Sequence, residues 1–184
     1  MLQYERRLPH WDTQERPVFV TFRLEGSLPA KRVFPTKGLS AGRAFVAMDR
    51  LLDTAQSGPL MLAQPQIARV VTEAVLDGER RFGRYRLHAY VVMPNHVHML
   101  ITQQVAMVRW LGSLKGYTAC EANRILGCPG RSFWQGESFD HMVRSEQEFE
   151  RIRAYIEENP VRAGLVARAE EYEWSSANMH EPMG

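Results

Sequence analysis

The chain has little of several features that would narrow its function at once. It carries two cysteines, Cys120 and Cys128, which form no Cys-x-x-Cys pair, so no disulfide framework is indicated and a reducing compartment is favoured. No apolar run approaches the roughly 20 residues that a membrane-spanning helix needs. The first residues, MLQYERRLPHW, lack the apolar block of a secretory signal. We therefore expect a cytoplasmic protein that does not enter a membrane.

An excess of one charge is also missing. The 23 Lys and Arg residues nearly balance the 21 Asp and Glu residues, for a formal net charge of +2, so total charge alone does not indicate nucleic-acid binding. The arginines do cluster, at positions 80, 81, 84 and 86 and again at 144, 151 and 153. Such clusters are compatible with a surface that faces phosphates, although solvated helix faces look the same.

The 184 residues, 45% of them hydrophobic, predict one domain with a core of normal size. Residues 17–24 alternate as a strand with one buried face. Helical spacing follows at 38–55, 65–79, 105–126 and 146–158, a hairpin at 84–93 and 96–102, and a strand or kinked strand pair at 132–143. Gly127 is a plausible C-cap of the third helix, and Asn159-Pro160 is expected to stop the fourth.

This order predicts an α+β fold with a ferredoxin-like βαββαβ core. Its antiparallel sheet is expected to carry helices on one face and leave the other open for a site. The core spans about residues 15–143, and residues 144–184 form a C-terminal helical extension.

The segment VVMPNHVHML places two histidines in the second strand of the predicted hairpin. Residues i and i+2 of a strand point to the same side, so His96 and His98 project together from the face opposite Val97 and Met99. Neutral imidazole is a common metal ligand. Two ligands rarely complete a site, and two surface histidines without a metal remain the alternative.

The predicted helix at 105–126 has a polar face as well as an apolar stripe. Tyr117 and Glu121 lie one turn apart on it, so the carboxylate could be a third, oxygen ligand and the tyrosine could attack something that the metal holds. A half-buried packing role for Tyr117 and a solvated Glu121 are the ordinary alternatives.

At these residues the chain resembles a known family. MPNHVHML followed by GYTACEANRILG is similar to the HUH single-strand endonucleases with one catalytic tyrosine, and among them to the REP-associated tyrosine transposases. The resemblance continues through RRLPHWDTQERPVFVTFRL, FWQGESFDHMVR, YIEENPVRAGLV and EYEWSSA. These blocks cover nearly the whole chain in the expected order.

The resemblance implies an HUH endonuclease core in which His96 and His98 bind Mg²⁺ or Mn²⁺ and Tyr117 is the nucleophile. Relatives often carry a polar ligand such as Gln one turn after the tyrosine. Glu121 stands there in this chain and suits a hard cation, with Asn123 or Glu137 as possible substitutes. The implied substrate is single-stranded DNA that folds into an imperfect hairpin beside a short guide sequence.

The implied reaction is a transesterification that leaves a 5′-phosphotyrosine and a 3′-hydroxyl, with the metal and Lys115 assisting the phenol. Arg6, Arg7 and His10 could read guide bases, and Lys115 and Arg144 could contact phosphates. Bases could stack on aromatic side chains, although core packing is the alternative for each of them: Trp11, Trp110, Phe133 and Trp134. His88 could support the site, but a structural histidine is the safer interpretation.

Two other functions remain open: a hairpin-binding protein that does not cut, and a metal enzyme of another type that uses the same histidines. A monomer is favoured because the C-terminal blocks are long, but a dimer is possible.

Overall fold

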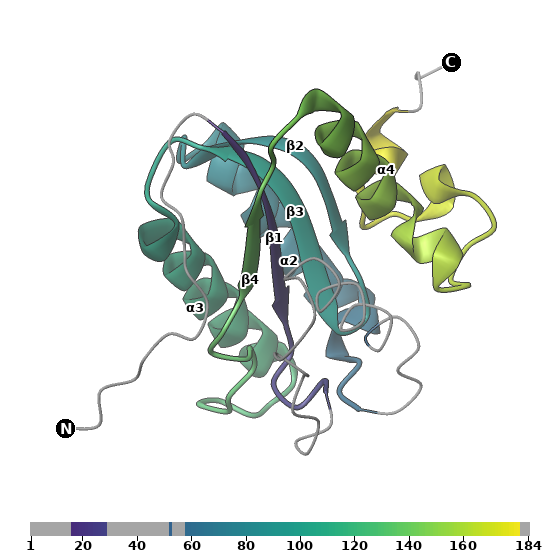
Figure 1. Ribbon diagram of the computed structural model, residues 1–184. Helices are drawn as coiled ribbons and strands as arrows, with labels where there is room; N and C mark the ends of the chain where they lie inside the picture. Colours follow the sequence, from purple (N-terminus) through teal and green to yellow (C-terminus); the bar gives the residue numbers. More distant parts are fainter. Residues whose placement is uncertain (1–15, 29–51, 53–57, 181–184) are drawn as a thin grey trace, which may run out of the picture.

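The computed structural model describes residues 16–28, 52 and 58–180 (Figure 1). The predicted helix at 38–55 lies outside these residues apart from Leu52. The described elements run in the order strand, helix, two strands, helix, strand, helix, which contains the succession expected of a βαββαβ core. No helix among the described residues is both long enough and apolar enough to cross a membrane.

Four antiparallel strands form one sheet in the order β2-β3-β1-β4. Strand β3 (His96–Gln103) is central and pairs with β1 (Pro17–Arg23) and with β2 (Tyr85–Val92). Strand β4 (Phe139–Met142) is short and pairs with the other side of β1. The two histidines therefore lie in the middle of the sheet, where strands on both sides exclude water.

Helices α2 (Pro65–Arg80) and α3 (Met107–Ile125) cover one face of the sheet, here called the α2/α3 face. Alternation along β1 and β3 directs large apolar side chains to this face. They form one buried cluster with the inner stripe of α3, including Val20, Phe22, Met99, Leu111 and Leu114. The predicted apolar stripe of α3 is thus confirmed, and Gly127 follows the helix with φ +67°, as a C-cap glycine should.

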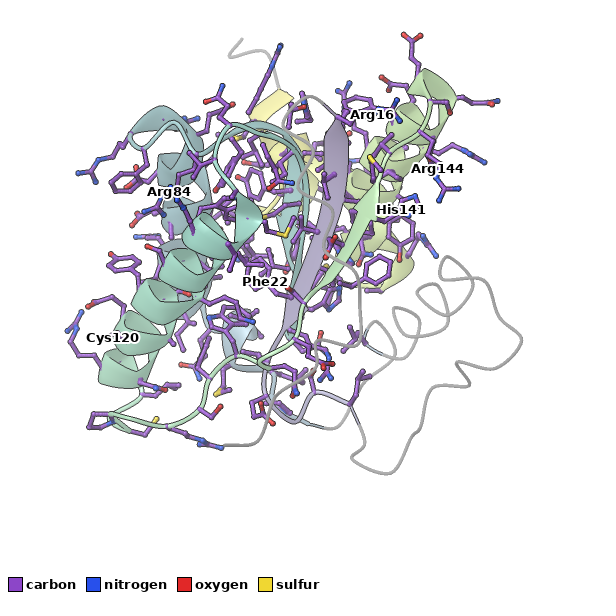
Figure 2. The ribbon with its side chains drawn as sticks, turned by 60° about the vertical axis from the view of Figure 1, so that its left-hand side comes forward. Arg16, Phe22, Arg84, Cys120, His141 and Arg144 are labelled. Carbon is purple, nitrogen blue, oxygen red and sulfur yellow. The ribbon has the colours of Figure 1, made fainter. Side chains whose placement is uncertain are left out.

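Helix α4 (Glu146–Arg162) covers the other face, here called the histidine face, as Figure 2 shows with α3 and α4 on opposite sides of the sheet. A second apolar cluster fills this layer, including Phe19, Leu100, Val143 and Ile156. The prediction that helices cover one face and leave the other open is therefore wrong. Alternation in β1 distinguishes the two faces of the sheet correctly, but it does not show that both faces are buried. On the histidine face Phe19 is 3% exposed and Thr21 2%.

Helix α4 also continues past its predicted end. Pro160 lies inside it, and Asn159 and Pro160 are both buried. Proline removes one amide donor, but Ala163 and Leu165 still donate to the carbonyls of Asn159 and Pro160 at 2.9 Å. The extra turn keeps Asn159 on the same helix as Tyr155, one turn further along.

The remaining described segments are single turns: η1 (Met61–Ala63), η2 (Ala169–Glu171) and η3 (Ser176–His180). The chain between η2 and η3 lies along the end of β2. The amide of Val92 donates to Trp174 O at 2.8 Å, the hydroxyl of Tyr172 donates to Val92 O at 2.9 Å, and Val91 forms a bridge with Ser175. This contact covers part of the outer edge of the sheet.

Candidate active site

The histidine pair is the centre of the polar region on the histidine face. His96 stands opposite Arg23 and His98 opposite Thr21 in the β1–β3 register. The two Nε2 atoms lie 3.0 Å apart, and both residues are 0% exposed. The prediction that both rings point to one side is confirmed, but they are covered rather than open to solvent.

Hydrogen bonds on the far side of each ring fix its orientation. The Asn95 side chain donates through Nδ2 to Leu52 O at 3.0 Å and turns Oδ1 toward His96 Nδ1 at 2.6 Å. Since Oδ1 can only accept, Nδ1 of His96 carries the hydrogen and Nε2 presents its lone pair to His98. The Thr21 hydroxyl, 2.7 Å from His98 Nδ1, can donate to that nitrogen, so His98 carries its hydrogen on Nε2 and donates it to His96 Nε2 at 3.0 Å.

Helix α4 brings a tyrosine to this pair. The ring centroid of Tyr155 lies 5.9 Å from that of His98 and 6.4 Å from that of Phe19. The guanidinium of Arg162, two turns further along α4, sits 4.6 Å from the centre of the Tyr155 ring. A half-buried phenol, two imidazoles and a guanidinium are thus gathered on one face of the sheet.

Asn159 follows Tyr155 by one helical turn and is 0% exposed. Neither its Oδ1 nor its Nδ2 has a hydrogen-bond partner among the residues that the structure describes. A buried amide without partners costs about 1–3 kcal/mol, and Asn159 belongs to the helix that brings Tyr155 to His98. An amide oxygen is a suitable ligand for Mg²⁺ or Mn²⁺.

The structure does not bring Tyr117 and Glu121 to the histidines. Both belong to α3, which covers the opposite face. Tyr117 is 58% exposed, and the carboxylate of Glu121 pairs with Arg124 at 3.0 Å. Within the described residues, no group of three or more His, Cys, Asp or Glu side chains could hold a metal ion. The predicted set of His96, His98 and Glu121 is therefore not assembled.

The two residues named as substitute ligands have other surroundings. Asn123 donates through its side chain to Arg131 O at 2.6 Å and ties down the turn after α3. Glu137 is exposed in the chain just before β4, and its negative charge partly offsets the lowering of the Arg23 pKa by burial.

The predicted DNA contacts are dispersed. Arg6, Arg7 and His10 lie outside the described residues. Arg144 is exposed just before α4, on the histidine side of the sheet (Figure 2). Lys115 donates to the carbonyls of Gln135 and Gly136 at 2.6 and 3.1 Å, so it holds the chain that leads into β4.

The aromatic residues proposed for base stacking are mostly core residues. Trp110, Phe133 and Trp134 are 1%, 2% and 7% exposed, and Trp134 Nε1 donates to Thr118 Oγ1 at 2.9 Å. Trp11 lies outside the described residues. His88 contacts Thr102 Oγ1 at 2.8 Å and packs on Phe149, and burial, with help from Arg86, lowers its pKa. The structural interpretation therefore fits these residues.

Sequence reasoning missed Tyr155 and Asn159, although the segment YIEENPVRAGLV contains both. The signal was the same spacing of four that drew attention to Tyr117 and Glu121. An Asn-Pro pair normally ends a helix, so the sequence does not predict that Asn159 continues the helix of Tyr155.

Comparison with known proteins agrees with this fold. Residues 66–159 match the family described as IS200-like transposases, a stretch that includes His96, His98, Tyr155 and Asn159. The chain therefore belongs to the IS200-like transposase family.

Two relatives extend the comparison. The REP-associated tyrosine transposase of Escherichia coli (strain K12) is 25% identical over 101 residues, which cover 53% of this chain and 57% of that relative. The match thus spans little more than half the length of the curated relative. A solved structure of a REP-associated tyrosine transposase bound to a REP hairpin superposes with a TM-score of 0.57 and 19% identity, covering 97% of this chain and 84% of that one. At this identity the likeness shows the fold alone.

Proposed function

We propose that this protein is a metal-dependent enzyme that cuts and rejoins single-stranded DNA beside hairpins, with Tyr155 as its nucleophile. The observation that carries the proposal is the approach of the Tyr155 ring to His98, 5.9 Å between centroids, on a face that otherwise packs apolar side chains. Membership of a transposase family supports the reaction class, and a fold shared with a relative solved on a REP hairpin supports hairpin DNA as the partner.

The residues present fit a divalent cation. The two Nε2 atoms lie 3.0 Å apart, close enough for both imidazoles to bind one divalent cation. Asn159 has a buried amide oxygen with no hydrogen-bond partner among the described residues. His96, His98 and Asn159 would therefore hold Mg²⁺ or Mn²⁺. When bound, the cation would withdraw negative charge from the non-bridging oxygens of the scissile phosphate.

Tyr155 carries the covalent step. Its phenolic oxygen attacks phosphorus, the bond from phosphorus to the 3′ oxygen breaks, and the strand leaves with a 3′-hydroxyl while its 5′ phosphate stays on the tyrosine. Attack by another 3′-hydroxyl reverses the step without ATP. About one free tyrosine in a thousand is ionised at pH 7, so the Arg162 guanidinium over the ring has a role: it stabilises negative charge on the phenol.

Both imidazoles are fully buried, so DNA reaches them only when the side chains over the histidine face move apart. Because α4 forms much of that cover and carries Tyr155 and Asn159, a shift of α4 would control entry and assembly of the site together. A flexible single strand can follow such an opening more easily than a stiff duplex.

The test is the formation of a covalent protein–DNA adduct. Labelled hairpin oligonucleotides with randomised single-stranded flanks are incubated with Mn²⁺ and the purified protein, and the adduct is resolved on a denaturing gel. We expect the parent to form it and Tyr155→Phe to lose it by at least about 10³-fold. Tyr117→Phe is the matched control and should retain it.

The alternatives give different results. Binding of the hairpin without any adduct would support a silent DNA-binding protein. Cleavage that survives Tyr155→Phe and yields no adduct would support a hydrolytic metal enzyme. An adduct that Tyr117→Phe abolishes and Tyr155→Phe leaves intact would overturn the assignment of the nucleophile.

A further inference from the structure

We propose that Arg23 binds a backbone phosphate of the DNA strand within one nucleotide of the scissile bond, an inference that rests on the proposed function. It adds to the histidine face a cation that belongs neither to the metal ligands nor to the nucleophile.

The register of the sheet places Arg23 beside the histidine pair. It is the last residue of β1, directly opposite His96 in β3. Directly opposed residues of antiparallel strands project to the same face with their Cβ atoms about 5 Å apart. The next residue, Leu24, donates its amide to Asn95 O at 2.9 Å, so the end of β1 is fixed against the turn that carries His96.

Most of the Arg23 hydrogen-bonding capacity is not used by the residues that the structure describes. A guanidinium has five N–H donors, and the described partner of this one is Ser27 Oγ at 3.2 Å. Arg23 forms no ion pair with any of the residues that the structure describes. Burial lowers its pKa, and the charges of Glu25 and Glu137 offset that effect only in part.

This state is unfavourable for the protein alone. A partly desolvated cation loses hydration that a neutral hydroxyl does not replace. The charges of the two exposed carboxylates nearby, Glu25 and Glu137, do not cancel the effect of burial on Arg23. A planar guanidinium suits phosphate because two parallel N–H groups can meet two oxygens.

A second cation strengthens the positive potential at this end of β1. Burial, followed by the charge of Arg23, lowers the pKa of Lys115 to about 8. The Lys115 ammonium is bound by the carbonyls of Gln135 and Gly136, which are neutral and leave its charge in place. Lys115 belongs to α3, which covers the opposite face, so it adds to the positive potential at the end of β1 without facing the histidines.

Arg16 provides a matched control, since it is exposed and lies at the opposite end of β1, where Figure 2 labels it. The variants are Arg23→Gln, Arg23→Lys and Arg16→Gln. Each is checked for thermal unfolding and then for affinity toward the fluorescein-labelled hairpin with its single-stranded flank, with Mn²⁺, by anisotropy at several salt concentrations. A set of oligonucleotides carries one neutral methylphosphonate at successive flank positions.

We expect Arg23→Gln to weaken binding by about 10- to 100-fold and to lower the slope of log affinity against log salt by about one phosphate contact. One methylphosphonate near the cleavage position should weaken the parent but not Arg23→Gln. Arg23→Lys should recover part of the affinity, because lysine keeps the positive charge but lacks the two parallel N–H groups of the guanidinium. Binding of Mn²⁺ alone should not weaken in any variant.

The inference would be overturned if Arg23→Gln and Arg16→Gln lost equal affinity for the hairpin, or if the methylphosphonate weakened binding as much in Arg23→Gln as in the parent. In either case, an adduct formed by the parent would still support the proposed function. A parent that neither binds the hairpins nor forms an adduct would overturn both. If Arg23→Gln does not fold, Arg23→Lys replaces it: a methylphosphonate effect smaller than that of the parent supports the inference, and an equal effect overturns it.

Discussion

Helices α3 and α4 carry the same short pattern, a tyrosine followed four residues later by a side chain able to bind a metal. In α3 the pair is the exposed Tyr117 and Glu121, whose carboxylate pairs with Arg124. In α4 it is Tyr155, half-buried with its ring near that of His98, and the buried Asn159. The two helices carry similar side chains but cover opposite faces of the sheet. Spacing within a helix therefore predicts which side chains lie together on that helix, but not which face of the sheet the helix covers.

The largest expected effect is loss of the adduct on substitution of Tyr155 but not of Tyr117. The next largest concerns metal binding by the residue four positions after each tyrosine, Asn159 or Glu121. Asn159→Ala should weaken Mn²⁺ binding about 10- to 100-fold, because it removes the amide oxygen, whereas Glu121→Ala should leave it unchanged. Calorimetric titration measures the affinity. Thermal unfolding gives a second readout, since Mn²⁺ at 100 times its Kd adds about 2.7 kcal/mol to stability.

Without metal, Asn159→Ala should change the free energy of unfolding by no more than about 1 kcal/mol, because the amide makes no hydrogen bond that could be lost. A large loss of stability without metal would mean that Asn159 is structural, and the two patterns would then not differ as proposed.

The helix starts differ as well. The Ser145 side chain caps α4 by accepting from the amide of Glu148 at 3.1 Å, while Ala106 begins α3 without a side-chain cap. Ser145→Ala should lower the free energy of unfolding by about 1 kcal/mol, as measured in urea. Ala106→Ser has a cap to gain and should not destabilise. Equal losses at both starts would contradict the contrast.

The smallest effect is expected on the outer side of α3. A Cβ at Gly112 or Gly116 would meet nothing within 4 Å, so Gly116→Ala should stabilise the protein by about 0.5–1 kcal/mol. Adduct formation should not change, because this surface lies away from the histidine face. A loss of adduct with full stability would assign α3 a role in the reaction after all.

Much of the fold could be predicted from the sequence because local periodicity fixes it. Strand β1, the hairpin that carries His96 and His98, and helix α2 have bounds close to those expected, and the inner stripe of α3 packs as its spacing requires. These features depend on side-chain alternation and on helical repeat, which neighbours in sequence determine.

The site could be predicted only in part. The shared direction of His96 and His98 follows from alternation, but the partner helix does not, because it depends on which layer α4 joins after β4. Pro160 obscured that helix further, since proline normally ends one. The burial of Phe19 and Thr21 was hidden for the same reason: a strand with mixed polarity on one face resembles an open face until a helix is known to cover it.

The contact between the chain near Trp174 and strand β2 has a consequence for assembly. Val92 is held there by backbone and side-chain hydrogen bonds, so this end of β2 cannot pair with a strand of a second molecule. Truncation of the chain before Tyr172 would leave the Val92 amide and carbonyl without these partners. A strand of a second molecule could then pair with this end of β2. The segment from Tyr172 to Ser175 thus protects against aggregation and is not part of the proposed site.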